Sequence, residues 1–135
     1  EPVSKLAEWL PKADFILCSL PLTAETEHLI AAPEFSVMKE SAIIVNVGRG
    51  PVIDQAALAR ALSDNVIAGA CLDVYDIEPL PADSPFWALP NVMLSPHVAG
   101  TGGSMEGSFG SLVDENLTRF KDGRPLVNAL KIINS

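Results

Sequence analysis

The chain lacks several features that would assign it quickly to a class of protein. Only 19% of its 135 residues are charged, 6% are aromatic, and two are cysteines. No apolar run approaches the roughly 18 residues that a membrane span needs. The first residues, Glu1-Pro2-Val3, have neither the basic start nor the apolar segment of a secretory signal. We therefore expect a cytoplasmic protein with no membrane partner. Because the chain does not begin with Met, we also expect it to be a piece of a longer protein.

Basic residues are scarce as well. The chain has nine Lys and Arg residues and seventeen Asp and Glu residues, which gives a net charge of −8. Such a surface repels phosphate backbones and anionic lipid, so we expect no nucleic-acid partner, although one well-placed Arg can still bind a small anion. Cys18 and Cys71 lie in apolar runs without metal-ligand spacing. We expect two reduced core thiols rather than a disulfide or a metal site.

Apolar residues make up 48% of the chain, and its length suits one domain. Four short runs read as strands, at Asp14–Leu20, Ala42–Val47, Ala68–Val74 and Val92–Ser95. These runs are apolar throughout instead of alternating, which predicts strands covered on both faces.

Helical patterns occur at Ala32–Met38, Gln55–Ser63 and Ser104–Lys121. Asp54 can cap the second of these, and Asn65 and Gly123 can end the second and third. The third has an apolar stripe made by Phe109, Leu112, Val113, Leu117 and Phe120. Strands that alternate with helices predict an α/β fold with a parallel sheet. We place a boundary in the glycine-rich stretch that follows the last strand, with residues 1–100 in the sheet domain and 101–135 in a C-terminal helix and tail.

Ligands of such sheets bind beyond the carboxyl ends of the strands, where this chain has four ionisable residues. Arg49, between two glycines, could hold a carboxylate in a bidentate pair. His97 could transfer a proton near neutral pH, with Glu78 orienting it. Asp73 must meet a donor, either a backbone amide of its own chain or an amide of a ligand. Taken singly, Arg49 could be a surface arginine, Glu78 a loop residue and His97 a structural histidine. Together these residues suit the reduction of a 2-keto acid.

Several motifs follow one another in a specific order: Pro21-Leu22-Thr23-Ala24-Glu25-Thr26, Val45-Asn46-Val47-Gly48-Arg49-Gly50, Leu72-Asp73-Val74-Tyr75, Glu78-Pro79-Leu80-Pro81, Asn91-Val92 and Ser95-Pro96-His97. In this order the chain resembles the D-isomer-specific 2-hydroxyacid dehydrogenase family over nearly its whole length. The resemblance implies a Rossmann-like NAD(P)-binding domain and hydride transfer between NAD or NADP and a 2-keto or D-2-hydroxy acid, such as glyoxylate, hydroxypyruvate or a glycerate. It also implies a homodimer for the intact protein.

The resemblance also assigns roles to individual residues. Arg49 matches the arginine that binds the substrate carboxylate, Glu78 its acid partner, and His97 the proton donor and acceptor. Asp73 would receive the nicotinamide carboxamide. The cofactor-binding positions implied are Pro21, Thr26, Val47, Gly48, Arg49, Asp73, His97 and Gly100. Gly48 stands where the family commonly has Ser or Ala, which predicts a looser loop.

One motif of the family is missing. The phosphate-binding turn G-x-G-x-x-G does not occur, since Gly48-Arg49-Gly50-Pro51-Val52-Ile53 lacks the third glycine. We therefore interpret the chain as the second half of the NAD(P)-binding domain, without the first half and without the substrate domain. Its first strand would expose an apolar edge, so the isolated chain should aggregate, pair with a copy or be held by the missing half, and should show no turnover. A cofactor-sensing co-repressor and an inactive remnant are the alternatives.

Overall fold

The computed structural model describes residues 5–101 and 105–129. The chain divides into two compact units, Glu1–Ala99 and Gly100–Ser135. The first unit contains the whole sheet.

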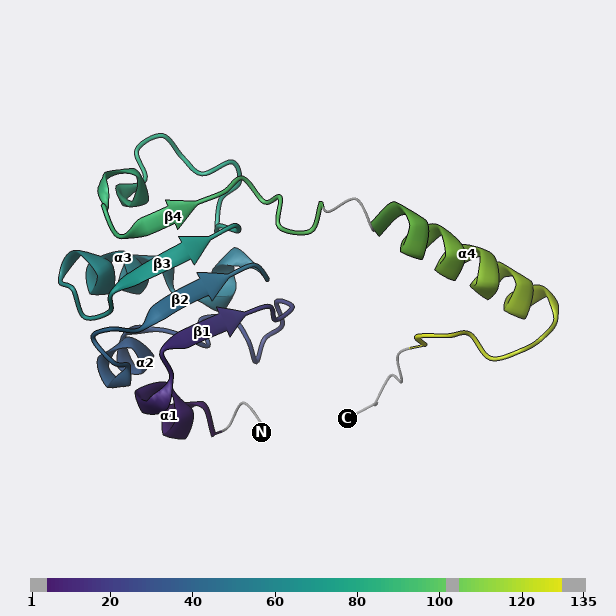
Figure 1. Cartoon of the computed structure of the whole chain (residues 1–135), viewed down its shortest axis with the longest axis horizontal. Coiled ribbons are helices and arrows are strands. Elements are labelled where there is room, and N and C mark those ends of the chain that lie inside the picture. Colours follow the sequence, from purple (N-terminus) through teal and green to yellow (C-terminus); the bar gives the residue numbers. More distant parts are fainter. Residues whose placement is uncertain (1–4, 102–104, 130–135) are drawn as a thin grey trace. The chain divides into compact units, whose positions relative to one another are not determined.

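The first unit is built on a parallel sheet of four strands in the order β1-β2-β3-β4 (Figure 1). The strands are β1 (Phe15–Cys18), β2 (Ile43–Asn46), β3 (Gly69–Leu72) and β4 (Val92–Leu94). All three neighbouring pairs are parallel, which confirms the predicted α/β architecture. Each strand is shorter than its apolar run because the ends of the runs already belong to the turns.

Short helices and turns precede the first strand and connect the four strands. The helices of the first unit are α1 (Leu6–Trp9), α2 (Ala32–Val37) and α3 (Gln55–Ser63), and the 3₁₀ turns are η2 (Leu10–Lys12), η3 (Gly50–Val52) and η4 (Pro85–Ala88). The prediction of α3 is confirmed together with its cap, because the Asp54 carboxylate accepts the Ala57 N–H over 2.9 Å. Asn65 follows in the left-handed region, with φ of 55°. The four-residue α1 was not predicted, because it has no side-chain cap and is too short to show a period.

One face of the sheet carries the core. Ile16, Ile44, Ala70 and Val92 lie side by side in register and contribute to a cluster that includes Phe35 of α2 and Leu58 and Leu62 of α3. The expectation of cover on both faces is wrong for this unit, since Leu17 and Met93 on the other face are 67% and 69% exposed. The reason is that the helices packed against the sheet contribute to a single core.

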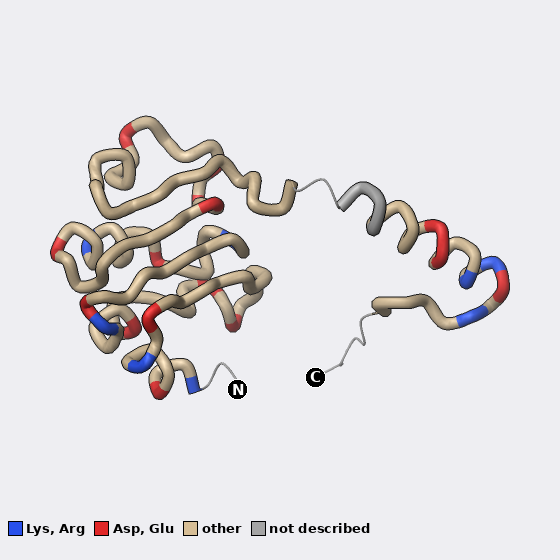
Figure 2. Tube along the Cα trace, in the orientation of Figure 1, with Lys and Arg blue, Asp and Glu red and all other residues tan. Residues whose placement is uncertain are grey.

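Strand β1 forms one edge of the sheet, as predicted, and its Phe15 is 71% exposed. Cys18 is buried, and burial raises the pKa of its thiol. Cys71 is partly exposed on the other face, and both cysteines are free thiols. The strands contain no charged residue, and charged positions of both signs lie mainly in the connections around them (Figure 2).

The second unit contains one long helix, α4 (Met105–Lys121). Ser104, where we predicted this helix to begin, lies outside the described residues. Gly123, with φ of 66°, follows the last turn as predicted. The side chains of Phe109, Val113, Leu117 and Phe120, which belong to the predicted apolar stripe, are exposed. Of the helices in the described ranges, none is long and apolar enough to cross a bilayer.

Candidate active site

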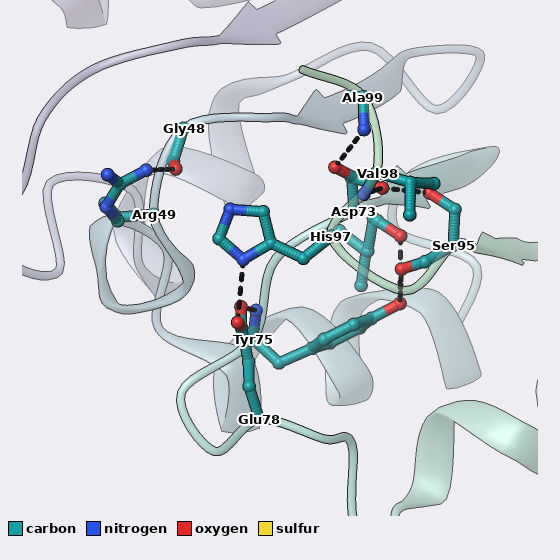
Figure 3. A network of polar contacts seen from close by, with 10 residues as sticks. Gly48, Arg49, Asp73, Tyr75, Glu78, Ser95, His97, Val98 and Ala99 are labelled. Atoms are coloured by element: carbon teal, nitrogen blue, oxygen red, sulfur yellow. Dashed lines mark hydrogen bonds and ion pairs between the residues drawn. The ribbon is translucent and has the colours of Figure 1, made fainter. Parts of the chain in front are cut away.

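The carboxyl ends of the four parallel strands lie along the same edge of the sheet, and most of the predicted site residues lie at this carboxyl edge. Pro21 and Thr26 follow β1, while Val47, Gly48 and Arg49 follow β2; Asp73 and Glu78 follow β3, and His97 follows β4. The chain direction common to all four strands therefore brings residues that are far apart in sequence to the same edge. Figure 3 shows Arg49, Asp73, Glu78 and His97 in one view.

Glu78 and His97 are in direct contact. The Oε2 atom of Glu78 lies 2.7 Å from Nδ1 of His97, and its Oε1 accepts the Tyr75 N–H over 3.0 Å. The hydrogen bond to His97 is the main reason why the pKa of Glu78 lies below its ordinary value, and the Tyr75 N–H and the charge of Arg49 add to this effect. The carboxylate is therefore ionised and fixed in its orientation.

The backbone of His97 is unusual. Its φ of 57° lies in the left-handed region, which costs energy for any residue with a Cβ atom. The side chain is 46% exposed. The ring uses Nδ1 to contact Glu78, whereas Nε2 has no hydrogen-bond partner among the described residues. Nε2 is thus available to a bound molecule.

Asp73 stabilises the turn that contains His97. Its buried carboxylate accepts hydrogen bonds from the Ser95 hydroxyl, the Val98 N–H over 2.9 Å and the Ala99 N–H over 2.8 Å (Figure 3). Burial alone would raise the pKa of Asp73, but these three hydrogen bonds outweigh it and keep the pKa below its ordinary value. Asp73 is thus bonded to donors of its own chain, two of them backbone amides, which is the first of the two alternatives that the sequence left open. A carboxylate has about four acceptor positions, and these hydrogen bonds use three of them.

Asn46, the last residue of β2, stabilises the loop that follows this strand through two hydrogen bonds. Its Nδ2 donates to the Arg49 carbonyl oxygen over 3.0 Å and its Oδ1 accepts the Gly48 N–H over 3.1 Å. The Arg49 guanidinium donates to the Gly48 carbonyl oxygen over 2.7 Å. It makes no hydrogen bond to Glu78 or His97 within the described chain, although its charge acts on Glu78. Of the three predicted catalytic residues, the structure joins two directly and places the third within electrostatic reach.

The glycines on either side of Arg49 allow close backbone contacts. A Cβ atom at Gly50 would lie 2.0 Å from the Tyr75 carbonyl carbon, and one at Gly48 would lie 2.6 Å from the Leu20 carbonyl oxygen. The looser loop expected from Gly48 stays a prediction, and the structure gives this glycine a second role. It allows the segments after β1 and β2 to touch, and Gly50 does the same for the segments after β2 and β3.

The segment after β1 is a turn stabilised by its own side chains. The Thr26 hydroxyl donates to the Pro21 carbonyl oxygen and accepts the Thr23 N–H, both over 2.7 Å. The Val47 N–H donates to the Cys18 carbonyl oxygen over 2.9 Å, and the Val47 side chain is exposed at the edge. Gly100 is exposed and begins the second unit, so its assignment to the cofactor stays a prediction.

A cavity of about 570 Å³ lies beside the Glu78–His97 pair. Leu80, Trp87 and Leu94 contribute apolar walls, and the ionisable residues of its lining are Tyr75, Glu78 and His97. In the described part of the chain, no three side chains of the metal-ligating types gather in one place. The groups that this edge offers are therefore proton carriers, an arginine and backbone amides.

Sequence reasoning missed three residues of this network: Asn46, Tyr75 and Ser95. A polar residue within the apolar run that ends at Val47 was the available signal for Asn46. Ser95 contacts Asp73 and Tyr75 from about twenty residues away in sequence, so no local pattern identifies the link among these three residues.

Comparisons with known proteins match most of the chain. Residues 1–99 match the family model described as D-isomer specific 2-hydroxyacid dehydrogenase, NAD binding domain. A glyoxylate reductase of Korarchaeum cryptofilum is 44% identical over 122 residues, which are 90% of this chain and 36% of that protein. A glyoxylate/hydroxypyruvate reductase B of Escherichia fergusonii is 54% identical over 89 residues, which are 66% of this chain and 28% of that protein.

A solved structure is similar as well. A D-isomer-specific 2-hydroxyacid dehydrogenase from Xanthobacter autotrophicus, in complex with NADPH and MES, superposes with a TM-score of 0.87 at 38% identity. The match covers 95% of this chain and 52% of that chain. This chain thus spans about a third of the length of the two curated relatives.

Proposed function

Because this chain belongs to the D-isomer-specific 2-hydroxyacid dehydrogenase family, we propose that the intact protein reduces a 2-keto acid to a D-2-hydroxy acid with NADH or NADPH. Glyoxylate and hydroxypyruvate are the substrates to test first, since they are named for the relatives. The observation that carries the proposal is the Glu78–His97 pair, whose Nε2 atom is open to a ligand at an edge that also holds Arg49.

Arg49 is proposed to bind the carboxylate of the keto acid. A guanidinium presents a planar fork of donors that matches a carboxylate. The present hydrogen bond to the Gly48 carbonyl oxygen uses only Nη1. The remaining donors are sufficient for a bidentate pair. The backbone of the loop is held by Asn46, so a substrate bound there has a defined position.

His97 is proposed to supply the proton. As a carbonyl is reduced, its oxygen becomes an alkoxide and takes up one proton, so a donor near neutral pH is required. Glu78 accepts a hydrogen bond from Nδ1, which orients the ring and leaves Nε2 to hold the proton that moves to the substrate oxygen. In the oxidative direction the same Nε2 removes the hydroxyl proton.

The residues present fit the nicotinamide half of the cofactor. Asp73 keeps one acceptor position for the carboxamide, and Val47 offers an exposed apolar side chain at the same edge. When bound, the dihydronicotinamide supplies the hydride for the carbonyl carbon. Pro21, Thr26 and Gly100 are proposed as further contacts. The diphosphate would depend on parts of the protein beyond this chain, which has no G-x-G-x-x-G turn.

The test uses the intact protein and the oxidation of NADH or NADPH with glyoxylate or hydroxypyruvate. We expect His97→Gln to lower kcat by about 100- to 10,000-fold, the usual contribution of a general acid. Cofactor binding, followed by the fluorescence of the reduced nicotinamide, should remain. His28→Gln is the matched control, because His28 is the other histidine of the chain and makes no hydrogen bond to Glu78 in the described residues. A wild-type protein that binds cofactor but reduces neither acid would favour a cofactor sensor.

The state of the intact protein is a further proposal. A homodimer would supply one cover for the exposed face of the sheet around Leu17 and Met93. The two free thiols agree with a reducing compartment such as the cytoplasm. Sedimentation of the intact protein tests the dimer, and a monomer would exclude it.

A further inference from the structure

We propose that Tyr75 is a positioning residue, which fixes the distance and angle between Glu78 and His97 through its hydroxyl and its backbone N–H. The inference rests on the proposed function in one respect, the importance of the pair for proton transfer. The contacts themselves are independent of that function.

The backbone of Tyr75 holds one member of the pair. Its N–H donates to Oε1 of Glu78 over 3.0 Å, while Oε2 of the same carboxylate contacts His97. With both oxygens bound, the carboxylate cannot rotate without losing one of the two contacts. The place of Glu78 therefore depends on where the Tyr75 peptide lies.

The side chain of Tyr75 holds the segment that leads to the other member. Its hydroxyl lies 3.0 Å from the Leu72 carbonyl oxygen, at the end of β3, and 2.9 Å from the Ser95 carbonyl oxygen, just beyond β4. Ser95 precedes His97 by two residues. One phenol proton thus lies between the ends of two strands, and Figure 3 shows the ring between the Glu78 segment and Ser95.

The third contact concerns the loop that carries Arg49. The peptide after Tyr75 fills the space where Gly50 would carry a Cβ atom. Tyr75 therefore touches the segments of all three proposed catalytic residues. Each of these segments leaves a different strand, and the contacts of Tyr75 add to those by which Asp73 holds the turn of His97 and Asn46 holds the loop of Arg49.

Packing alone would not require the hydroxyl. Tyr75 is 7% exposed and belongs to the apolar core, and a phenylalanine would fill the same space. A buried hydroxyl is tolerated only with partners, and here both acceptors are backbone carbonyls at strand ends. Burial raises the pKa of the phenol, so it stays protonated and remains a donor. We therefore assign the hydroxyl the role of linking the Leu72 and Ser95 carbonyl oxygens.

The test compares Tyr75→Phe with Asn91→Ala. The first removes only the hydroxyl, and the backbone N–H stays. The second removes a side-chain hydrogen bond of 3.1 Å to the Leu62 carbonyl oxygen, at the amino end of β4 and away from the pair. For NMR, both variants are made in the 135-residue chain carrying Leu17→Lys and Met93→Lys, which reduce the apolar surface of the exposed sheet face. For kinetics, both are made in the intact protein.

In the 135-residue chain, the pKa of Glu78 is read from its side-chain carboxyl resonance. We expect Tyr75→Phe to raise this pKa toward its ordinary value, because the contact with His97 that lowers it becomes less well ordered. Asn91→Ala should leave it unchanged. In the intact protein we expect Tyr75→Phe to lower kcat by about three- to tenfold, the effect of losing one hydrogen bond, with the KM for cofactor unaltered.

An unchanged Glu78 pKa in a folded Tyr75→Phe chain would overturn the inference, even if its thermal stability falls. The NMR result does not depend on turnover, so an inactive wild-type protein would refute the proposed function and leave this test valid. A second measurement needs no Tyr75 variant. Tyr75 is the only tyrosine of the chain, so its ring resonances are unambiguous. They should shift with the titration of Glu78, and this step should vanish in Glu78→Gln; the absence of any step in the wild type would also refute the inference.

Discussion

Asn46 donates from its Nδ2 atom to the main-chain carbonyl oxygen of Arg49 over 3.0 Å, so a buried amide sets the position of an exposed cation. Its Oδ1 accepts the Gly48 N–H, and the side chain is 1% exposed. Removing it would leave two backbone groups of the arginine loop without their partner.

We expect Asn46→Ala to lower the free energy of unfolding by about 1–3 kcal/mol, the cost of unsatisfied buried polar groups. In the intact protein the KM for the keto acid should rise more than the KM for the cofactor, because the loop carries the proposed carboxylate ligand. Urea unfolding and steady-state kinetics measure both effects. Equal changes in the two KM values would contradict the role assigned to the loop.

Acid should destabilise the first unit through two carboxylates. The pKa values of Glu78 and Asp73 are lower in the folded chain than their ordinary values of 4.5 and 3.8. The folded state therefore binds fewer protons, and the stabilisation is complete above these values and is lost as the pH falls through the lower, folded ones. Asp73→Asn should remove more of this pH dependence than Glu78→Gln, since Asp73 is buried and Glu78 is exposed.

Urea unfolding between pH 7 and pH 3 measures how the free energy of unfolding of each variant depends on pH. Glu40→Gln, at an exposed position in the connection before β2, is the control and should leave the pH dependence as it is. If Asp73→Asn and Glu40→Gln gave the same slope below pH 5, the contribution of the hydrogen-bonded carboxylate would be refuted.

Gly50→Ala should destabilise the chain strongly. The added methyl group would lie 2.0 Å from the Tyr75 carbonyl carbon, and the atoms to be displaced belong to backbone rather than to a flexible side chain. We expect a loss of about 3 kcal/mol or more, at the upper end of overpacking costs. Gly100→Ala has no neighbour within 4 Å of the new atom and should change the thermal midpoint little. Equal midpoints for the two variants would show that the loops after β2 and β3 can separate freely.

The isolated chain should associate through the exposed face of its sheet. Leu17 on β1 and Met93 on β4, the two edge strands, are 67% and 69% exposed on this face. We expect Leu17→Lys combined with Met93→Lys to reduce the sedimentation coefficient at high concentration and the binding of a hydrophobic dye, with little loss of stability. Lys replacement of the exposed Glu8 and Glu40, on other surfaces, is the control. Unchanged association in the double variant would exclude this face.

The elements of the fold were predictable where one local signal dominated. α3 was predicted with its bounds because Asp54 caps it and Leu58 and Leu62 mark its buried face. The strands were predicted from their apolar runs. Cover on both faces could not be inferred, because an apolar run does not show whether the elements that would cover it belong to the same chain.

The candidate site was predictable in part. Glu78 and His97 were paired from the rule that parallel strands end at one edge and from the resemblance to the family, and their contact is confirmed. The network beneath them was not predictable. Tyr75 donates to one carbonyl oxygen at the end of β3 and to another just beyond β4, and the second contact depends on register and twist rather than on residue order.

The left-handed backbone of His97 has a consequence for protein engineering. Its φ of 57° favours glycine or asparagine. The partly exposed contact with Glu78 offers only modest compensation. A library randomised at this position and sorted by heat resistance alone should therefore enrich those two residues and discard the imidazole. Selection for robustness and selection for turnover would lead to different amino acids at one and the same codon.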